Sequence, residues 1–303
     1  MPLDPQVEAM RAEREGDQVP QLYTQTLAEA RAADLADIQA AGGDVEPVHH
    51  VEDLTTEGGV PLRVYRPDLT GPLPTVIYFF GGGWTLGSIE TADGISRKLA
   101  NAVPCQVITV GYRLAPEHPF PAAVEDAWAT VEWVAKHAAD LGGDPSRIAV
   151  MGDSAGGNLA AVVSLMARDA GGPAIGAQVL IYPAVEMYEK FPSEAANANG
   201  PVLTSTQMST FGHLYMGERY GDESWQASPL RAASHADLPP AHIITALHDP
   251  IRDHGTRYAE ALRAAGTSVS LVDYDTAFHG FMSLPGVAPA AREALDGIVA
   301  FLR

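Results

Sequence analysis

Met151-Gly152-Asp153-Ser154-Ala155-Gly156-Gly157 contains the pattern G-x-S-x-G. It follows an apolar run at residues 148–151, typical of a buried strand, and precedes residues 158–168, whose apolar side chains recur at helical spacing. A serine at a sharp strand-to-helix turn is held exposed in a strained conformation, and glycines two residues away on either side avoid collisions. We therefore predict that Ser154 is a nucleophile; the alternative is a tight glycine turn whose serine caps the helix.

Outward from this turn, short apolar runs alternate with helical patterns along most of the chain. The predicted strands are residues 62–65, 75–80, 107–110, 148–151, 179–182, 241–246 and 269–274, and the later helices are 122–139, 158–168, 255–265 and 289–303. Most of these strands are apolar throughout, which is typical of a parallel sheet covered on both faces by helices. The sequence therefore predicts an α/β fold.

Two segments lie outside this alternation. Residues 4–42 have the pattern of two helices that end before Gly42-Gly43. Almost sixty residues separate the strand ending at Tyr182 from the strand that begins at Ala241. Because a structureless loop of that length is unusual in a compact protein, we predict an inserted helical segment there.

Ser154 needs a general base, and the base needs a carboxylate that orients it. Where the nucleophile occupies a G-x-S-x-G turn, the acid and the histidine follow it in that order, each after a late strand. Asp249 follows the predicted strand 241–246, and His279 follows 269–274. We therefore predict the triad Ser154, Asp249 and His279.

Other residues near the acid compete for these roles. Asp253 lies four residues beyond Asp249, and His248 and His254 flank the same loop. We favour Asp249 because it stands at the end of its strand, and His279 because it alone follows the last predicted strand.

A second glycine cluster, Phe80-Gly81-Gly82-Gly83-Trp84, ends the predicted strand 75–80. Glycines at this point leave backbone N–H groups uncovered, so they are able to donate to an oxygen that becomes negative during reaction. We predict that Gly82 and Gly83, together with the Ala155 N–H, form an oxyanion hole. A simple mobile loop is the alternative.

These residues together give the chain a clear resemblance. It resembles the α/β-hydrolase fold and, within it, the bacterial hormone-sensitive-lipase-like esterases of family IV. The similarity spans roughly residues 48–303 and is carried by five stretches: Gly152-Asp153-Ser154-Ala155-Gly156-Gly157, Gly81-Gly82-Gly83-Trp84, residues 112–123 (YRLAPEHPFPAA), Asp249-Pro250-Ile251-Arg252-Asp253 and Phe278-His279-Gly280-Phe281.

The resemblance implies a mostly parallel eight-stranded sheet flanked by helices, with a helical cap. Residues 1–47 and an insertion at about 185–228 are expected to form the cap, and residues 48–303 the catalytic domain. It also implies hydrolysis of short to medium acyl esters without a metal or an organic cofactor. A homodimer through the edge strand 269–274 is a further expectation.

The chain departs from the family at Phe80, where these esterases usually have a histidine that anchors the glycine loop through hydrogen bonds. A phenylalanine side chain makes no such bonds, so we expect packing to hold the loop.

Composition narrows the possible partners. The 303 residues include 38 Asp and Glu against 19 Lys and Arg, and this net charge of −19 makes nucleic acid an unfavourable partner. Cys105 is the single cysteine, so no intrachain disulfide is expected. No apolar run reaches the ~20 residues of a membrane span, and residues 1–20 lack the apolar core of a signal peptide. We therefore expect a cytoplasmic protein.

The expected reaction is attack of Ser154 on an ester carbonyl, followed by hydrolysis of the acyl-enzyme by water. Four residues are expected to line the substrate entrance: Trp84, Phe211, Leu214 and Tyr215. An amidase, lactonase or carbamate hydrolase would use the same machinery, and a non-catalytic small-molecule receptor would use the same fold.

Overall fold

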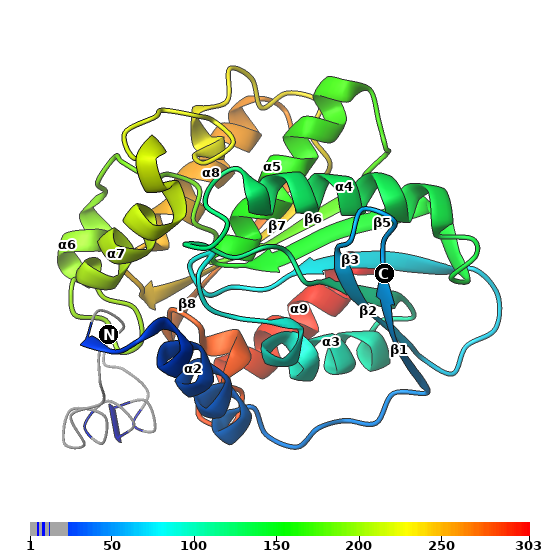
Figure 1. Cartoon of the computed structure of the whole chain (residues 1–303), viewed down its shortest axis with the longest axis horizontal. Helices are drawn as coiled ribbons and strands as arrows, with labels where there is room; N and C mark the ends of the chain where they lie inside the picture. Colours follow the sequence, from blue (N-terminus) through cyan, green and yellow to red (C-terminus); the bar gives the residue numbers. More distant parts are fainter. Residues whose placement is uncertain (1–4, 6–7, 10–11, 13–23) are drawn as a thin grey trace.

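A central sheet organises the molecule (Figure 1). The computed structural model describes residues 5, 8, 9, 12 and 24–303, and eight strands within the last range form one sheet. The strands are β1 (His50–Thr55), β2 (Pro61–Arg66), β3 (Leu73–Phe79), β4 (Gln106–Val110), β5 (Gly143–Asp153), β6 (Ala177–Ile181), β7 (Ala241–His248) and β8 (Val269–Phe278).

The strand order is β1-β2-β4-β3-β5-β6-β7-β8. Strand β2 pairs antiparallel with β1 and β4, and the other neighbours are parallel, which confirms the predicted mostly parallel sheet. Burial is almost complete in β3, β4 and β6 and in β5 from Ile148 onward, as their continuous apolar runs predict. Strand β1 lies at the sheet edge and is mostly exposed, so its sequence contains no apolar run that would predict it.

Helices cover both faces of the sheet. Figure 1 shows α4 (Ala122–His137), α5 (Ala155–Ala170) and α8 (Arg252–Ala264) on one face, with α3 (Ile89–Ala102) and α9 (Ala290–Leu302) on the other. Four of these helices match predicted patterns, whereas α3 is absent from the predicted elements. The sequence does contain an N-cap residue for this helix, Ser88. Its hydroxyl accepts hydrogen bonds from the Glu90 and Thr91 amides.

The remaining helices lie near the carboxyl end of the sheet. Helix α2 (Leu27–Ala41) begins at Thr26, whose hydroxyl and Glu29 form a capping box. The first helix predicted within residues 4–42 falls largely outside the described residues. Between β6 and β7 the chain forms α6 (Pro192–Ala196), α7 (Ser205–Met216), and the 3₁₀ turns η2 (Gly217–Arg219) and η3 (Pro229–Arg231). The interval between β6 and β7 is therefore helical in part, as predicted.

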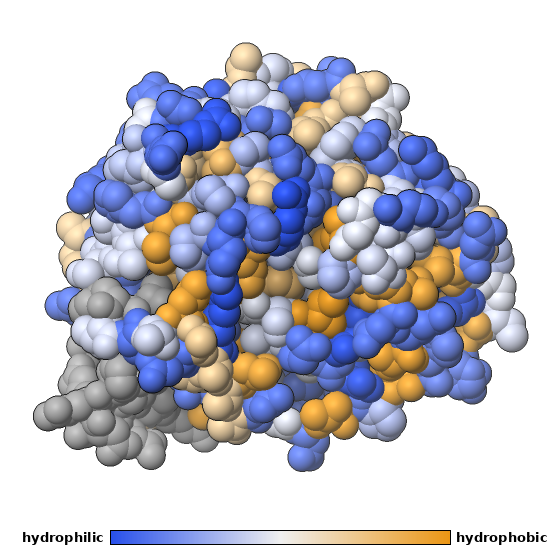
Figure 2. Space-filling model, viewed as in Figure 1, coloured by the Kyte–Doolittle hydropathy of each residue, from blue (hydrophilic) through white to orange (hydrophobic). Residues whose placement is uncertain are grey.

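On the face seen in Figure 2, hydrophilic residues surround small groups of apolar ones. Among the described residues, no helix is both long and apolar enough to cross a membrane. The same part of the chain contains no group of three or more His, Cys, Asp or Glu side chains placed to hold a metal ion.

Candidate active site

Ser154 lies between β5 and α5 in a conformation that L-residues rarely adopt, with φ 54° and ψ −115°. Close packing explains the glycines around it. A Cβ atom at Gly152 would lie 2.7 Å from the Phe79 carbonyl oxygen, and one at Gly156 would overlap the same carbonyl group. Only hydrogen atoms fit at these two positions, so α5 approaches β3 and β5 closely and the Ser154 side chain is held at the turn.

The structure brings Ser154, His279 and Asp249 into one hydrogen-bonded chain. His279 Nε2 lies 2.9 Å from Ser154 Oγ, and His279 Nδ1 lies 2.7 Å from Asp249 Oδ2. Asp249 is fully buried directly after β7, and the Ile251 N–H donates to its second oxygen at 2.8 Å. The carboxylate thus fixes the imidazole with Nε2 directed at the serine hydroxyl, the geometry that general-base activation requires.

Two of the competing residues, Asp253 and His254, occupy other places. The Asp253 carboxylate accepts a hydrogen bond from the Ser193 N–H at 3.0 Å, so it ties α6 to the start of α8. His254 lies in α8 with 2% of its surface exposed, and neither ring nitrogen has a hydrogen-bond partner among the described residues. Burial lowers the pKa of His254 to about 4, so its ring is neutral at neutral pH. Neither residue joins the chain of hydrogen bonds to Ser154.

Gly82 and Gly83 lie on the loop after β3 with φ angles of 112° and 60°, which glycine adopts without strain. The Gly82 carbonyl accepts hydrogen bonds from the Thr85 N–H at 3.1 Å and the Leu86 N–H at 2.8 Å. Both glycines line the same cavity as Ser154, and within the described part of the chain no acceptor takes a hydrogen bond from either glycine N–H. These amides are therefore available to a ligand oxygen.

Asp153 holds the start of this loop, a role that the sequence reasoning missed. Its carboxylate accepts hydrogen bonds from the Gly81 N–H at 2.9 Å and the Tyr78 hydroxyl at 2.6 Å. The Tyr112 hydroxyl donates to the Phe80 carbonyl at 2.7 Å, so the Phe80–Gly81 peptide is fixed at both ends. Burial raises the pKa of Asp153, and it raises the pKa of Tyr78 well above its usual value.

Packing also holds the loop at Phe80. The Phe80 ring is 3% exposed and stacks on the Tyr112 ring with a centroid separation of 4.3 Å. One tyrosine therefore supplies both a stacking surface for Phe80 and a hydrogen bond to its carbonyl. This arrangement agrees with the expectation that packing anchors the loop where phenylalanine is present.

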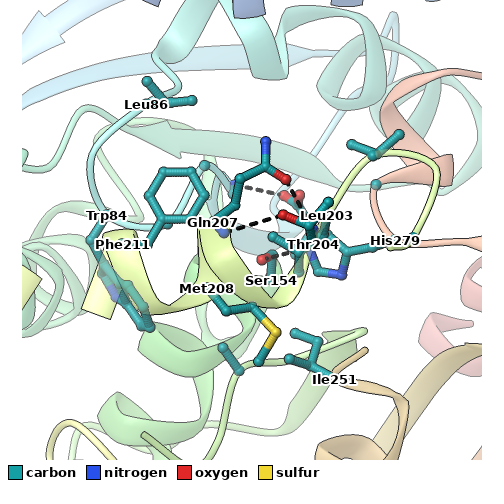
Figure 3. A pocket seen from close by; sticks show the side chains of 18 of the residues that line it. Trp84, Leu86, Ser154, Leu203, Thr204, Gln207, Met208, Phe211, Ile251 and His279 are labelled. Carbon is teal, nitrogen blue, oxygen red and sulfur yellow. Dashed lines mark hydrogen bonds between the residues drawn. The ribbon is translucent and has the colours of Figure 1, made fainter. Parts of the chain in front are cut away.

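A cavity of about 830 Å³ opens over Ser154 and His279. Figure 3 shows side chains of α7, including Gln207, Met208 and Phe211, around the serine and the histidine. Its other walls come from the glycine loop, from Ile251 beside the acid, and from residues of α2. The cavity is large enough for a small organic ligand and is bounded on one side by the segments that were expected to form a cap.

Of the four residues expected to line the entrance, the structure places Trp84 and Phe211 in the cavity wall. Leu214 and Tyr215 are not in the wall, because they lie in the last turn of α7, beyond the part of the helix that faces the cavity. Tyr215 is fully buried and its ring stacks on Trp84 at 4.2 Å. The expectation is therefore corrected: Tyr215 supports a wall residue and does not itself contact the cavity.

Polar side chains of Ser193 in α6 and of Asn197, which caps its end, hold the loop that carries the acid. The Ser193 hydroxyl donates to the Pro250 carbonyl at 2.7 Å. The Asn197 amide donates to the carbonyls of Leu247 and Asp249, both at 3.1 Å. Neither residue has a sequence signal, because both contacts join segments about fifty residues apart.

Comparison with known proteins identifies the family. A sequence model for the alpha/beta hydrolase fold matches residues 76–283, which is more than half of the chain. The chain belongs to the α/β-hydrolase fold family. The predicted fold class and the resemblance noted from the motifs are both confirmed.

Relatives of this α/β-hydrolase include two proteins of Mycobacterium tuberculosis. Esterase LipI is 45% identical over 266 residues, covering 84% of this chain and 83% of the relative. Carboxylesterase NlhH is 46% identical over 249 residues, covering 80% and 78%. Among solved structures, a hyperthermophilic esterase from the archaeon Pyrobaculum calidifontis matches with a TM-score of 0.94 and 40% identity, covering 100% of this chain and 98% of that one.

Proposed function

We propose that this protein is a serine carboxylesterase that hydrolyses short to medium acyl esters through an acyl-enzyme. The observation that carries the proposal is the continuous chain of hydrogen bonds from Asp249 through His279 to Ser154. Ser154 and His279 line a cavity. The names of the relatives, which are esterases and carboxylesterases, support the same reaction.

In the proposed acylation step, Ser154 Oγ attacks the ester carbonyl carbon while His279 Nε2 takes the hydroxyl proton. The carbonyl oxygen becomes negative and accepts hydrogen bonds from the amides of Gly82, Gly83 and Ala155. His279 then gives its proton to the leaving alcohol as the carbon–oxygen bond breaks. Asp249 stabilises the imidazolium that exists between these two transfers.

Deacylation repeats these steps with water as the nucleophile. His279 takes a proton from water, the hydroxide attacks the acyl carbon, and the Ser154 oxygen leaves with the proton from His279. The products are a carboxylic acid and an alcohol. These steps use the three side chains of the triad, the three amides and the water that hydrolyses the acyl-enzyme.

We further propose that the segments above the cavity, α2 together with the insertion at about 185–228, act as the cap over the catalytic domain of residues 48–303. Strand β8 forms one edge of the sheet, in agreement with the expected place of a homodimer contact. Dimerisation through that edge and the cytoplasmic location stay predictions.

The test is hydrolysis of p-nitrophenyl esters from acetate to palmitate, combined with labelling by a serine-directed phosphonate and peptide mapping. We expect turnover of the shorter esters and one adduct, on Ser154. The Ser154→Ala variant should lose about 10⁴-fold or more in kcat while its circular dichroism spectrum stays unchanged.

Several outcomes would contradict this assignment. Turnover that survives in Ser154→Ala, or an adduct on another residue, would remove Ser154 from the reaction. Faster hydrolysis of an anilide than of the matching phenyl ester would favour the amidase alternative, and absence of both adduct and turnover would favour a binding protein.

A further inference from the structure

Arg31 of α2 makes four hydrogen bonds to segments that are distant in the sequence. Its Nε donates to the Thr85 carbonyl at 2.9 Å, and its Nη2 donates to the Ala115 carbonyl at 3.2 Å. The same guanidinium forms two bonds to the Glu117 carboxylate, at 2.8 and 2.9 Å. A single cation from α2 therefore joins the glycine loop after β3 to the loop after β4.

The bond to Thr85 is connected to the glycine amides by planar peptides. The Thr85 carbonyl and the Leu86 N–H belong to one peptide plane, and this N–H donates to the Gly82 carbonyl at 2.8 Å. The Gly82 carbonyl and the Gly83 N–H belong to the next plane. Since a trans peptide directs its carbonyl and its N–H in opposite directions, fixing the Gly82 carbonyl also fixes where the Gly83 N–H points.

The cation adds an electrostatic effect along the same path. Hydrogen bonds in series polarise one another, and a bond from an ionised donor is stronger than one between neutral groups. Donation from Arg31 to the Thr85 carbonyl thus strengthens the Leu86 bond to Gly82 and makes the Gly83 N–H a better donor.

We propose that Arg31 is a positioning residue for the oxyanion amides: through two peptide planes, it sets the direction and donor strength of the Gly83 N–H. This inference rests on the proposed function, in which Gly83 donates to the developing oxyanion. It assigns to α2 a part in the chemistry, besides covering the cavity.

The ion pair with Glu117 does not by itself account for this arrangement. The Glu117 side chain is 50% exposed, and ion pairs with an exposed partner contribute little to stability. The two bonds to backbone carbonyls are the contacts that reach the loop. Glu117 binds Nη1 and Nη2, whereas the bond to Thr85 comes from Nε.

The test compares Arg31→Met with Glu117→Gln in the full chain. Methionine keeps much of the side-chain volume but removes every donor, so we expect kcat for p-nitrophenyl butyrate to fall about tenfold or more with KM within about twofold. The rate of phosphonate labelling of Ser154 should fall by a similar factor, because the phosphonyl oxygen uses the same amides. Glu117→Gln keeps both carbonyl contacts and should retain kcat within about twofold.

Each variant is assayed well below its own measured unfolding temperature, so that lost stability does not lower kcat. Arg31→Gln is the second variant, in case Arg31→Met does not fold, and a smaller fall in kcat is expected from its uncharged donor. An unchanged kcat in either folded variant, an effect confined to KM, or an equal loss in Glu117→Gln would overturn the positioning role. If the wild-type protein shows neither ester turnover nor a Ser154 adduct, the proposed function itself has failed.

Discussion

The sheet and the segments above it contribute to the site in different ways. The sheet carries the reacting groups, since Ser154, Asp249 and His279 directly follow β5, β7 and β8. The segments above it carry side chains that hold the connecting loops, such as Arg31 on the glycine loop and Asn197 on the acid loop. The chemistry therefore resides at the strand ends, and the loops take part of their geometry from helices outside the sheet.

The two regions also differ in how strongly they fix their residues. Parallel ladders join β5 to β8 through many backbone hydrogen bonds and a continuous buried core. The loops depend on single side-chain bonds, each of which contributes about 0.5–1.5 kcal/mol, or more when one partner is charged. Changes to the reacting groups should therefore alter the rate most, and changes to the loop contacts should alter it less.

The largest difference in kcat is expected between variants of the two aspartates, Asp249 and Asp253, that follow β7. Asp249→Asn leaves the shape of the site intact but removes the charge that orients His279, so kcat should fall by about 10⁴-fold. Asp253→Asn keeps an oxygen that accepts from the Ser193 N–H, so kcat should stay within about tenfold of wild type, the worth of one hydrogen bond. Steady-state hydrolysis of p-nitrophenyl butyrate measures both.

Thermal unfolding of both aspartate variants serves as the control, because a misfolded variant would imitate the loss of the acid. If Asp253→Asn were the more damaged of two folded variants, the acid would have to be reassigned to Asp253.

An intermediate effect is expected where α7 meets the glycine loop. A Cβ atom at Gly83 would overlap the Phe211 ring, and the φ of 60° disfavours alanine there. Gly83→Ala should therefore displace an oxyanion amide and lower kcat by about 100-fold, as the loss of one such donor does in other enzymes. Phe211→Ala should have a smaller effect by itself.

The double variant sharpens this comparison. Removing the ring relieves the overlap but not the backbone strain, so Phe211→Ala in the Gly83→Ala background should restore kcat about tenfold. Additive losses in kcat would show that α7 does not press on the loop.

The smallest effect concerns stability. The pKa of His254 is about 4 in the folded protein against 6.5 for a free histidine. Between pH 6.5 and pH 4 the unfolded chain therefore binds a proton at this histidine more readily than the folded protein does. The free energy of unfolding therefore decreases as the pH falls from 6.5 towards 4, and by pH 5 the decrease amounts to about 2 kcal/mol.

His254→Phe removes this titration and preserves the edge-to-face contact with Phe191, whose ring centroid lies 5.4 Å away. The free energy of unfolding in urea, measured at pH 7 and pH 5, should fall about 2 kcal/mol further in wild type than in the variant. Equal falls would mean that His254 is accessible to protons in the folded state.

Much of the fold was predictable because its signals are local. Continuous apolar runs identify the buried strands, and G-x-S-x-G identifies the turn at Ser154. The order of the strands along the chain indicated Asp249 and His279, since each follows a late strand. Strand β1 lacked such a signal because most of its residues are exposed, and α3 was overlooked although Ser88 marks its start.

The contacts that hold the loops had no comparable signal. Asp153 lies inside the motif, yet nothing in the sequence indicates that its carboxylate binds the Gly81 N–H. The error at Tyr215 has the same origin. The sequence pattern of an aromatic residue on a helix is the same whether its ring faces a cavity or stacks on Trp84.

The amino-acid sequence alone identifies the class of fold and the reacting groups, because these follow from burial patterns and from residue types at strand ends. The packed structure was needed to show which aromatic residues reach the cavity and that Arg31 of α2 is bonded to the glycine loop. The difference arises from the distance along the chain over which each interaction acts. Strand and turn preferences act over a few residues, whereas a hydrogen bond between side chain and loop depends on where the packed core places two distant segments.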